Sequence, residues 1–408
     1  MNDIRKIQIS EFDYKLPEHR IARYPLAQRD ASKLLVLKQN LLSQTVFSKI
    51  NDYLPDKALL VLNETKVVQA RLRFHTENGA AVELFVLEPA DLTMDFQVAY
   101  AQTSPVSWNC LVGNSKRWKQ GLLVQNVKIK GQSIDLKAER IEKRDGYSVI
   151  RFSWSQPQFS FAELLDAFGE TPLPPYLNRK AEPDDKSRYQ TVFAREEGSV
   201  AAPTASLHFT DALLADLQKQ GVEFEKLILH VGAGTFKPVS AAQIGEHEMH
   251  AEQIQVSRRS LQNLLQSIDR PVIPVGTTAM RTLESLYWFG LMLYEEGLAK
   301  RDFHLDQWFP YRDHQELPSV EASLGSLIAY LDHHDLESFK ATTALMIAPG
   351  YEMKIVDGLI TNFHQPKSTL LLLVAALIGE RWKESYQFAL ENDFRFLSYG
   401  DACLYLKQ

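Results

Sequence analysis

The stretch Ser199-Val-Ala-Ala-Pro-Thr-Ala-Ser-Leu-His-Phe-Thr210 joins a loop of small, uncharged residues to the start of a helix. Thr210 precedes Asp-Ala-Leu-Leu-Ala-Asp-Leu217, in which apolar residues recur at helical spacing. Further along, the apolar run Leu227-Ile-Leu-His230 changes into Val-Gly-Ala-Gly-Thr-Phe236, which predicts a buried strand that ends in a glycine loop. Both loops therefore place backbone amides and small polar side chains beside a core.

A cluster of titratable residues follows these loops. Glu246-His-Glu-Met-His-Ala-Glu252 holds two imidazoles and three carboxylates within seven residues. Such a density next to two turns of small residues is typical of an active site.

Outside residues 64–155 the chain alternates apolar runs with helical patterns, which predicts a mostly parallel α/β sheet. Ligands bind at the carboxyl edge of such sheets, so the polar residues that follow the strands are candidates for a site. Four strand ends carry them: Asn63 to Lys66, His230 to Thr235, Gly276 to Thr278, and Thr361 to His364. A solvated turn is the alternative interpretation of Asn63 to Lys66.

Residues 64–155 show a different pattern. They contain short runs in which apolar and polar residues alternate, and these runs predict an inserted small β barrel. The runs are 71–74, 81–87, 96–100, 108–112, 122–124, 127–129 and 147–154. We therefore divide the chain into an α/β domain, 1–63 with 156–408, and a barrel domain, 64–155.

One loop of the predicted barrel, Asn114 to Gly121, is basic. Lys116, Arg117 and Lys119 surround Trp118. The loop could hold nucleic-acid phosphates and stack a base on the tryptophan. In the alternative, it is a charged hairpin whose Trp118 closes the end of the barrel.

Two further segments predict binding surfaces. Pro172-Leu-Pro-Pro-Tyr-Leu-Asn-Arg179 is either a rigid wall that presents Tyr176 and Arg179 or a plain linker. Val275-Gly-Thr-Thr278 predicts a strand that runs into a helix, whose N-terminal amides favour an anion or a carboxylate. Neither a Walker loop nor a dinucleotide fingerprint is present, because Lys237 follows Gly232-Ala-Gly234 where a third glycine would stand.

The composition sets bounds on the function. At 408 residues we expect two or three domains, and the formal net charge of -6 restricts nucleic-acid binding to a local patch. Only Cys110 and Cys403 occur, which predicts two buried thiols rather than a disulfide or a thiolate metal site. The longest apolar run, Leu370 to Ile378, is too short to span a bilayer, so we expect a cytoplasmic protein without membrane contact.

Metal chemistry is the weaker interpretation of two histidine groups. A hydrolase would use His247, His250 and Glu252 with a metal, but the usual His-Glu-x-x-His order is missing. Asp332-His-His-Asp335 lies in the polar segment 297–341, which we interpret as a surface insertion. We predict no metal site.

Several long motifs together resemble one family, the S-adenosylmethionine:tRNA ribosyltransferase-isomerases of queuosine biosynthesis. The likeness runs in order along nearly the whole chain. The motifs are Phe12-Asp-Tyr, Ile21-Ala-Arg-Tyr-Pro25, Val200 to Phe209, His230 to Phe236, Glu246 to Glu252, Val275 to Thr278, Arg281-Thr-Leu-Glu-Ser285, Thr361-Asn-Phe-His364 and Ser398-Tyr-Gly-Asp401.

The resemblance implies a three-layer α/β domain interrupted by a small β barrel, acting on tRNA whose wobble position carries 7-aminomethyl-7-deazaguanine. The ribosyl part of S-adenosylmethionine is moved onto that amine and isomerised to epoxyqueuosine, and adenine and methionine are released. S-adenosylmethionine is then a consumed substrate and no further cofactor is needed. We expect a monomer.

This chemistry needs a base beside carbon 5′ and an acid for adenine. The catalytic candidates are His208, His250 and Glu252. The substrate-binding candidates are Arg179, Thr204, His230, Gly232, Gly234, Thr277, Thr278, Arg281, Asn362 and His364, and the tRNA-binding candidates are Lys116, Arg117 and Lys119. Arg281 would hold the methionine carboxylate, or else form a structural bridge to Glu284 or Glu252.

Four positions depart from the family pattern. Ser206 replaces glycine, Gly113 replaces arginine, Gln69 replaces proline and Gln365 replaces leucine. A serine at a glycine position can tighten a backbone site that needs freedom in φ. A non-catalytic tRNA-binding paralogue is therefore a further alternative.

Overall fold

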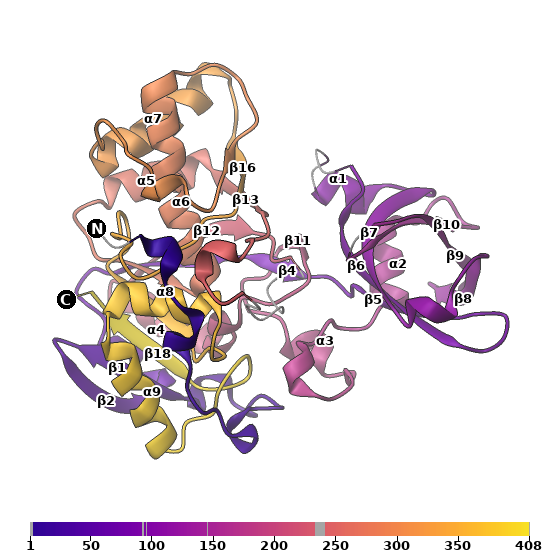
Figure 1. Ribbon diagram of the computed structural model, residues 1–408, viewed down its shortest axis with the longest axis horizontal. Helices are drawn as coiled ribbons and strands as arrows, with labels where there is room; N and C mark the ends of the chain where they lie inside the picture. Colours follow the sequence, from indigo (N-terminus) through magenta and orange to yellow (C-terminus); the bar gives the residue numbers. More distant parts are fainter. Residues whose placement is uncertain (1–2, 92–93, 95, 145, 233–240, 408) are drawn as a thin grey trace.

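The computed structural model describes residues 3–91, 94, 96–144, 146–232 and 241–407. Within these ranges ten strands form one mixed sheet and six form a second sheet, which lies to one side of the first (Figure 1). Across the large sheet the strands are β15 (His304–Leu305), β16 (Ser338–Thr343), β13 (Glu252–Ser257), β12 (Glu223–Leu229), β3 (Leu59–Asn63), β14 (Val272–Val275), β17 (Gly358–Asn362), β18 (Ala402–Leu406), β1 (Lys33–Lys38) and β2 (Leu41–Val46).

The centre of this sheet is parallel. Strands β12, β3, β14 and β17 are adjacent and run in one direction, so their carboxyl ends meet at one edge. Antiparallel pairs occur toward both flanks, between β12 and β13 and between β17 and β18. The four polar strand ends predicted from the sequence therefore come together.

The large sheet is covered on both faces, which gives the expected three layers. Along β3, Leu59 and Val61 enter one core while Leu60 and Leu62 enter the other, because strand side chains alternate between faces. The first core is completed by α5 (Arg258–Gln266), α6 (Thr277–Glu296), α7 (Val320–His333), α8 (Thr369–Ile378) and α9 (Arg381–Glu391). The second is completed by α4 (Asp211–Lys219) and the short 3-10 helix η5 (Phe47–Asp52).

Side-chain caps fix where several of these helices begin. Thr210 accepts a hydrogen bond from the amide of Leu213 at the start of α4, as the sequence predicted. Ser257, Ser319 and Ser368 cap α5, α7 and α8 in the same way. Helix α5 begins directly after the last residue of β13, Ser257.

The smaller sheet is antiparallel and nearly closes into a barrel, so an inserted barrel is confirmed (Figure 1). Its strands, in order, are β5 (Arg71–His75), β6 (Ala81–Pro89), β7 (Val106–Gly113), β10 (Ser148–Trp154), β9 (Gln132–Lys143) and β8 (Leu123–Ile129). Helix α2 (Phe161–Phe168) packs into the same core. Strand β9 was not predicted.

Short elements connect the two sheets. Strands β4 (Thr65–Val67) and β11 (Glu196–Ser199) pair in parallel, and α3 (Asp185–Arg188) lies nearby in the connecting chain (Figure 1). Helix α1 (Phe96–Ala101) reaches from the barrel to this ribbon, where Gln97 donates to the carbonyl of Glu197 at 2.5 Å.

One predicted strand of the barrel is wrong, and the structure decides between the two interpretations of Trp118. Phe96 to Tyr100 is helix α1 rather than a strand. Trp118 is only 2% exposed, donates to the carbonyl of Gly121 at 3.1 Å and lies under the guanidinium of Arg140. It therefore closes the barrel end and cannot stack a base.

Both cysteines are free and buried, as predicted. Within the described ranges, no helix combines the length and the apolar character needed to cross a membrane.

Candidate active site

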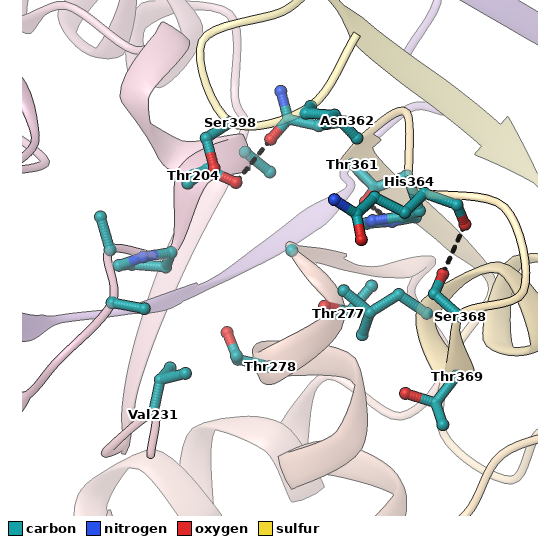
Figure 2. Close-up of a pocket in the computed structure, with 18 of the residues that line it drawn as sticks. Thr204, Val231, Thr277, Thr278, Thr361, Asn362, His364, Ser368, Thr369 and Ser398 are labelled. Atoms are coloured by element: carbon teal, nitrogen blue, oxygen red, sulfur yellow. Dashed lines mark hydrogen bonds between the residues drawn. The ribbon is translucent and has the colours of Figure 1, made fainter. Parts of the chain in front are cut away.

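A pocket lies at the carboxyl edge of the central parallel strands (Figure 2). It is built from the short helix η8 (Thr204–His208), the start of β13, the start of α6, and the loops that follow β12 and β17. Eight of the predicted site residues line it: Thr204, His250, Glu252, Thr277, Thr278, Arg281, Asn362 and His364. Segments far apart in the sequence thus converge on one cavity.

The start of α6 faces this pocket with free backbone donors. Gly276 has a φ of 95°, which glycine adopts without strain, and this turn directs the chain from β14 into the helix. Among the described residues no side chain caps α6, and Thr277 and Thr278 line the cavity (Figure 2). Open amides at a helix N-terminus favour an anion or a carboxylate.

The side chain of Asn63 has a structural role beside the start of α6 rather than contacting a ligand. Its amide donates to the carbonyl of Leu229 at 2.9 Å and to the hydroxyl of Thr278 at 3.3 Å. Its oxygen accepts from the amide of Leu229 at 3.1 Å. The side chain therefore ties the ends of β3 and β12 to the start of α6.

A nearly buried ion pair forms one wall of the pocket. Arg281 donates to Glu252 at 2.5 Å, and the amide of Gly232 approaches the other oxygen of that carboxylate at 3.3 Å. Within the described ranges Glu252 is the one carboxylate that Arg281 contacts. Arg281 also lines the pocket. Gly234 lies outside the described residues.

Glu284 binds backbone amides rather than Arg281, which excludes the structural bridge between Arg281 and Glu284. It is fully buried and accepts from the amides of Lys354, Ile355 and Val356 at 2.8, 3.0 and 3.1 Å. Burial raises the pKa of Glu284, and these bonds partly offset the effect. The carboxylate fastens the chain before β17 to α6.

Asn362 is the best-fixed polar group in the pocket. Its oxygen accepts from the hydroxyl of Thr204 at 2.8 Å (Figure 2), and its amide lies 3.0 Å from Nε2 of His208. His208 itself stands behind Asn362, outside the pocket lining, with Nδ1 2.8 Å from the hydroxyl of Ser32. Burial lowers the pKa of His208 to about 4, so the imidazole is neutral near pH 7.

His364 lies on the same wall as Asn362. Its Nε2 is 2.9 Å from the hydroxyl of Thr361, and its backbone amide donates to the hydroxyl of Tyr386 at 3.0 Å. Burial lowers the pKa of His364 to about 3. The ring is thus a neutral hydrogen-bonding group in this pocket.

His250 is the exposed imidazole of the cavity. It lies beside His247, whose pKa is lowered by burial and by the neighbouring His250. Of the three predicted catalytic residues, His250 and Glu252 line the pocket, and His208 contacts it through Asn362.

Two predicted substrate ligands lie elsewhere. Arg179 forms a two-pronged ion pair with Asp185 at 2.6 and 2.7 Å, and its Nε donates to the carbonyl of Arg23. His230 is buried between Thr65, at 2.9 Å from Nδ1, and the ring of Phe96. Neither side chain lines the pocket.

The sequence analysis missed Tyr189 and Ser398 as pocket residues. Ser398 stands in a family motif, and its hydroxyl is hydrogen-bonded to Tyr176, so Tyr176 forms a wall as one of the two interpretations of 172–179 expected. Tyr189 is brought in from beside α3, and no local sequence signal indicates this.

The basic loop lies on the barrel. Lys116, Arg117 and Lys119 are exposed on the connection between β7 and β8, and none has a carboxylate partner in the part of the chain that the structure describes. In that same part no group of three His, Cys, Asp or Glu side chains is placed to hold a metal ion.

Comparison with known proteins identifies the family. The family described as "Queuosine biosynthesis protein" matches residues 9–405. The S-adenosylmethionine:tRNA ribosyltransferase-isomerase of Syntrophotalea carbinolica is 38% identical over 98% of this chain and 100% of its own. The enzyme of the same name from Thermotoga maritima is 36% identical, also over 98% of this chain and 100% of its own.

Among solved structures, the crystal structure of S-adenosylmethionine tRNA ribosyltransferase from Thermotoga maritima covers 97% of this chain and 99% of its own, with 29% identity and a TM-score of 0.45. On the family match and the identities over nearly full length, the chain belongs to the S-adenosylmethionine:tRNA ribosyltransferase-isomerases of queuosine biosynthesis.

Proposed function

We propose that this enzyme moves the ribosyl group of S-adenosylmethionine onto 7-aminomethyl-7-deazaguanine at the wobble position of tRNA. The product is epoxyqueuosine, and adenine and methionine are released. S-adenosylmethionine is consumed as a substrate, without a separate cofactor. The observation that carries the proposal is the pocket, which is lined by residues of the motifs Val200 to Phe209, Glu246 to Glu252, Val275 to Thr278, Arg281 to Ser285 and Thr361 to His364 in a chain that belongs to this family.

The methionine end of S-adenosylmethionine would lie at the start of α6. Its carboxylate needs cationic or N–H donors, which the open amides at Thr277 and Thr278 and the guanidinium of Arg281 supply. Glu252 holds Arg281 in place through the 2.5 Å contact. We therefore assign two roles to Glu252: it positions Arg281, and it remains a candidate for the catalytic base.

Proton transfer would fall to His250, because it is the imidazole that is exposed in the pocket. His208 and His364, with low pKa values, are neutral near pH 7 and act as hydrogen-bonding groups. His208 would orient Asn362, whose amide it contacts at 3.0 Å.

Adenine release is the direct test. The purified enzyme is incubated with S-adenosylmethionine and either tRNA that carries the aminomethyl base or unmodified tRNA. We expect adenine only with the modified tRNA. A well-folded protein that binds tRNA without releasing adenine would instead be the non-catalytic paralogue.

His250→Ala should lower turnover by about 10²- to 10⁴-fold if His250 transfers a proton in the reaction. The control is the melting temperature, which we expect to stay unchanged because the side chain is exposed. Wild-type turnover by a folded His250→Ala enzyme would remove this residue from the mechanism.

A further inference from the structure

A second, smaller cleft adjoins the active-site pocket. The two cavities share Ser398 as a lining residue, and His208 lines the second cleft while contacting Asn362 of the first. The cleft therefore lies directly beside the pocket in which we propose that the reaction occurs.

Three arginines line this cleft: Arg29, Arg188 and Arg395. No aspartate or glutamate is among its lining residues. Arg395 is paired with Asp401 at 3.3 Å, so three cations stand against one carboxylate. Such an excess of positive charge is local, because the whole chain has a net charge of -6.

Arg29 and Arg188 have no carboxylate partner in the described ranges. Arg29 donates to the carbonyls of Gln190 and Ser187 at 2.6 and 3.0 Å, and Arg188 donates to those of Leu26 and Ala27. These bonds fix the two side chains between two segments of the chain while leaving both charges uncompensated. Burial and the charge of Arg188 lower the pKa of Arg29, as expected for cations held near each other.

A purely structural role of the arginines would explain why they donate to backbone carbonyls, but it would not explain why three positive charges lie close together. Guanidinium groups have five N–H donors each and suit the oxygens of a phosphate. A fixed set of guanidinium groups beside a nucleotide-modifying pocket is the arrangement that a backbone phosphate requires.

We infer that the cleft formed by Arg29, Arg188 and Arg395 binds a phosphodiester group of the tRNA substrate, next to the nucleotide that enters the active-site pocket. This inference rests on the proposed function, because it takes the ligand to be tRNA. S-adenosylmethionine carries no phosphate, so the cleft contributes to binding of one substrate only. Its occupant is the single-stranded segment around the wobble nucleotide.

The first test changes the RNA and leaves the enzyme intact. Anticodon stem-loops are prepared with an uncharged methylphosphonate at each linkage flanking the wobble nucleotide in turn. One such substitution should weaken binding to the wild-type enzyme and lower the salt slope of the binding constant by about 0.7. Unchanged binding at every flanking linkage would overturn the inference, whether or not any variant protein folds.

The second test changes the cleft. Arg395→Gln is the preferred variant, because within the described part of the chain the Arg395 side chain makes one ion pair and donates to no backbone carbonyl. It should lower the salt slope for tRNA by about 0.7 and leave the KM for S-adenosylmethionine unchanged. The methylphosphonate that weakens wild-type binding should have no further effect on this variant, because the two changes remove the same contact.

Arg258→Gln is the control, because Arg258 is also half-buried and pairs with one carboxylate, that of Asp332 at 3.4 Å, but lies on α5 away from the cleft. It should leave tRNA binding unchanged. Equal losses for the two variants, or additive effects of Arg395→Gln and the methylphosphonate, would contradict the inference. Stabilisation by inorganic phosphate that Arg395→Gln abolishes, with an unchanged tRNA slope, would identify a site for free phosphate instead.

Failure of this inference is distinguishable from failure of the proposed function. Adenine release by the wild-type enzyme tests the reaction and does not depend on where the phosphate binds. If adenine is released while the cleft tests fail, only the phosphate site is wrong.

Discussion

At the scale of single residues, Ser206 shows how a departure from the family pattern is accommodated. Its φ is not positive, so the backbone does not require glycine there. The side chain is 0% exposed, however, and its hydroxyl has no hydrogen-bond partner among the residues that the structure describes. The cost of the substitution is therefore a buried polar group without a partner, rather than backbone strain.

Ser206→Ala should raise the free energy of unfolding by about 1 kcal/mol, because it removes this unpaired hydroxyl. The measurement is the melting temperature of both proteins in one buffer. Ser199→Ala is the control, since the equally buried Ser199 donates to the carbonyl of Ala201 at 2.6 Å and should lose stability. A lower melting temperature for Ser206→Ala would show that the hydroxyl has a partner.

Two buried histidines predict an acid-sensitive stability. Burial lowers the pKa of His208 to about 4 and that of His364 to about 3, against 6.5 in an unfolded chain. Between pH 6.5 and about 4 the unfolded chain binds more protons at these rings, so stability should fall as the pH is lowered through this range. His208→Gln and His364→Gln should each flatten the dependence of melting temperature on pH. An unchanged slope in both variants would contradict this assignment.

The sequence identified residues of the pocket but not the partner of each side chain. Arg179 stands beside a proline-rich wall, and nothing local indicates that Asp185 holds it at 2.6 Å. His208 is in a family motif, yet it contacts the cavity only through Asn362, which is 154 residues away along the chain. Such choices depend on tertiary packing, which a sequence pattern does not contain.

At the scale of elements, the strand ends were predictable and one helix was not. Apolar runs that stop at polar residues mark the carboxyl ends of β3, β12, β14 and β17, and parallel pairing then brings these ends together. Phe96 to Tyr100 shows apolar residues at 96, 98 and 100, which resembles a strand. The structure buries Phe96, Ala99 and Tyr100 at helical spacing and leaves Val98 57% exposed.

The start of α6 carries the prediction for S-adenosylmethionine. Arg281→Lys keeps the charge but loses the planar fork and alters the contact with Glu252. We expect a higher KM for S-adenosylmethionine with unchanged tRNA affinity, because one interaction with the methionine carboxylate is weakened. Steady-state kinetics and tRNA binding are measured together.

The competing outcome for this variant is also defined. A melting temperature lower by several degrees, with the kinetics of the remaining folded enzyme unchanged, would make Arg281 a structural residue. Arg179 cannot then take its place, since its donors are used by Asp185 and the carbonyls of Arg23 and Lys180.

At the scale of the whole molecule, the barrel and the α/β domain meet beside the catalytic strands. Phe96 of α1 lies 5.2 Å from the ring of His230, which directly precedes the pocket residue Val231. Gly198 permits this contact, because a Cβ there would lie 2.5 Å from the imidazole. The sequence predicted an inserted barrel, but the buried role of His230 at its junction required the folded structure.

The exposed basic loop of the barrel gives the last prediction. Alanine at Lys116, Arg117 and Lys119 removes three exposed charges and should lower the salt slope of tRNA binding by roughly 2 if all three contact phosphates. The matched control is alanine at Lys128, Lys137 and Lys143, which are exposed on strands β8 and β9 and carry the same total charge. Both triple variants are compared by tRNA affinity over a series of salt concentrations, together with the KM for S-adenosylmethionine, which should not change. Equal slopes for the two variants would mean that the barrel attracts tRNA only through its overall charge and that the loop, with Trp118 buried beneath Arg140, is a hairpin that closes the barrel end.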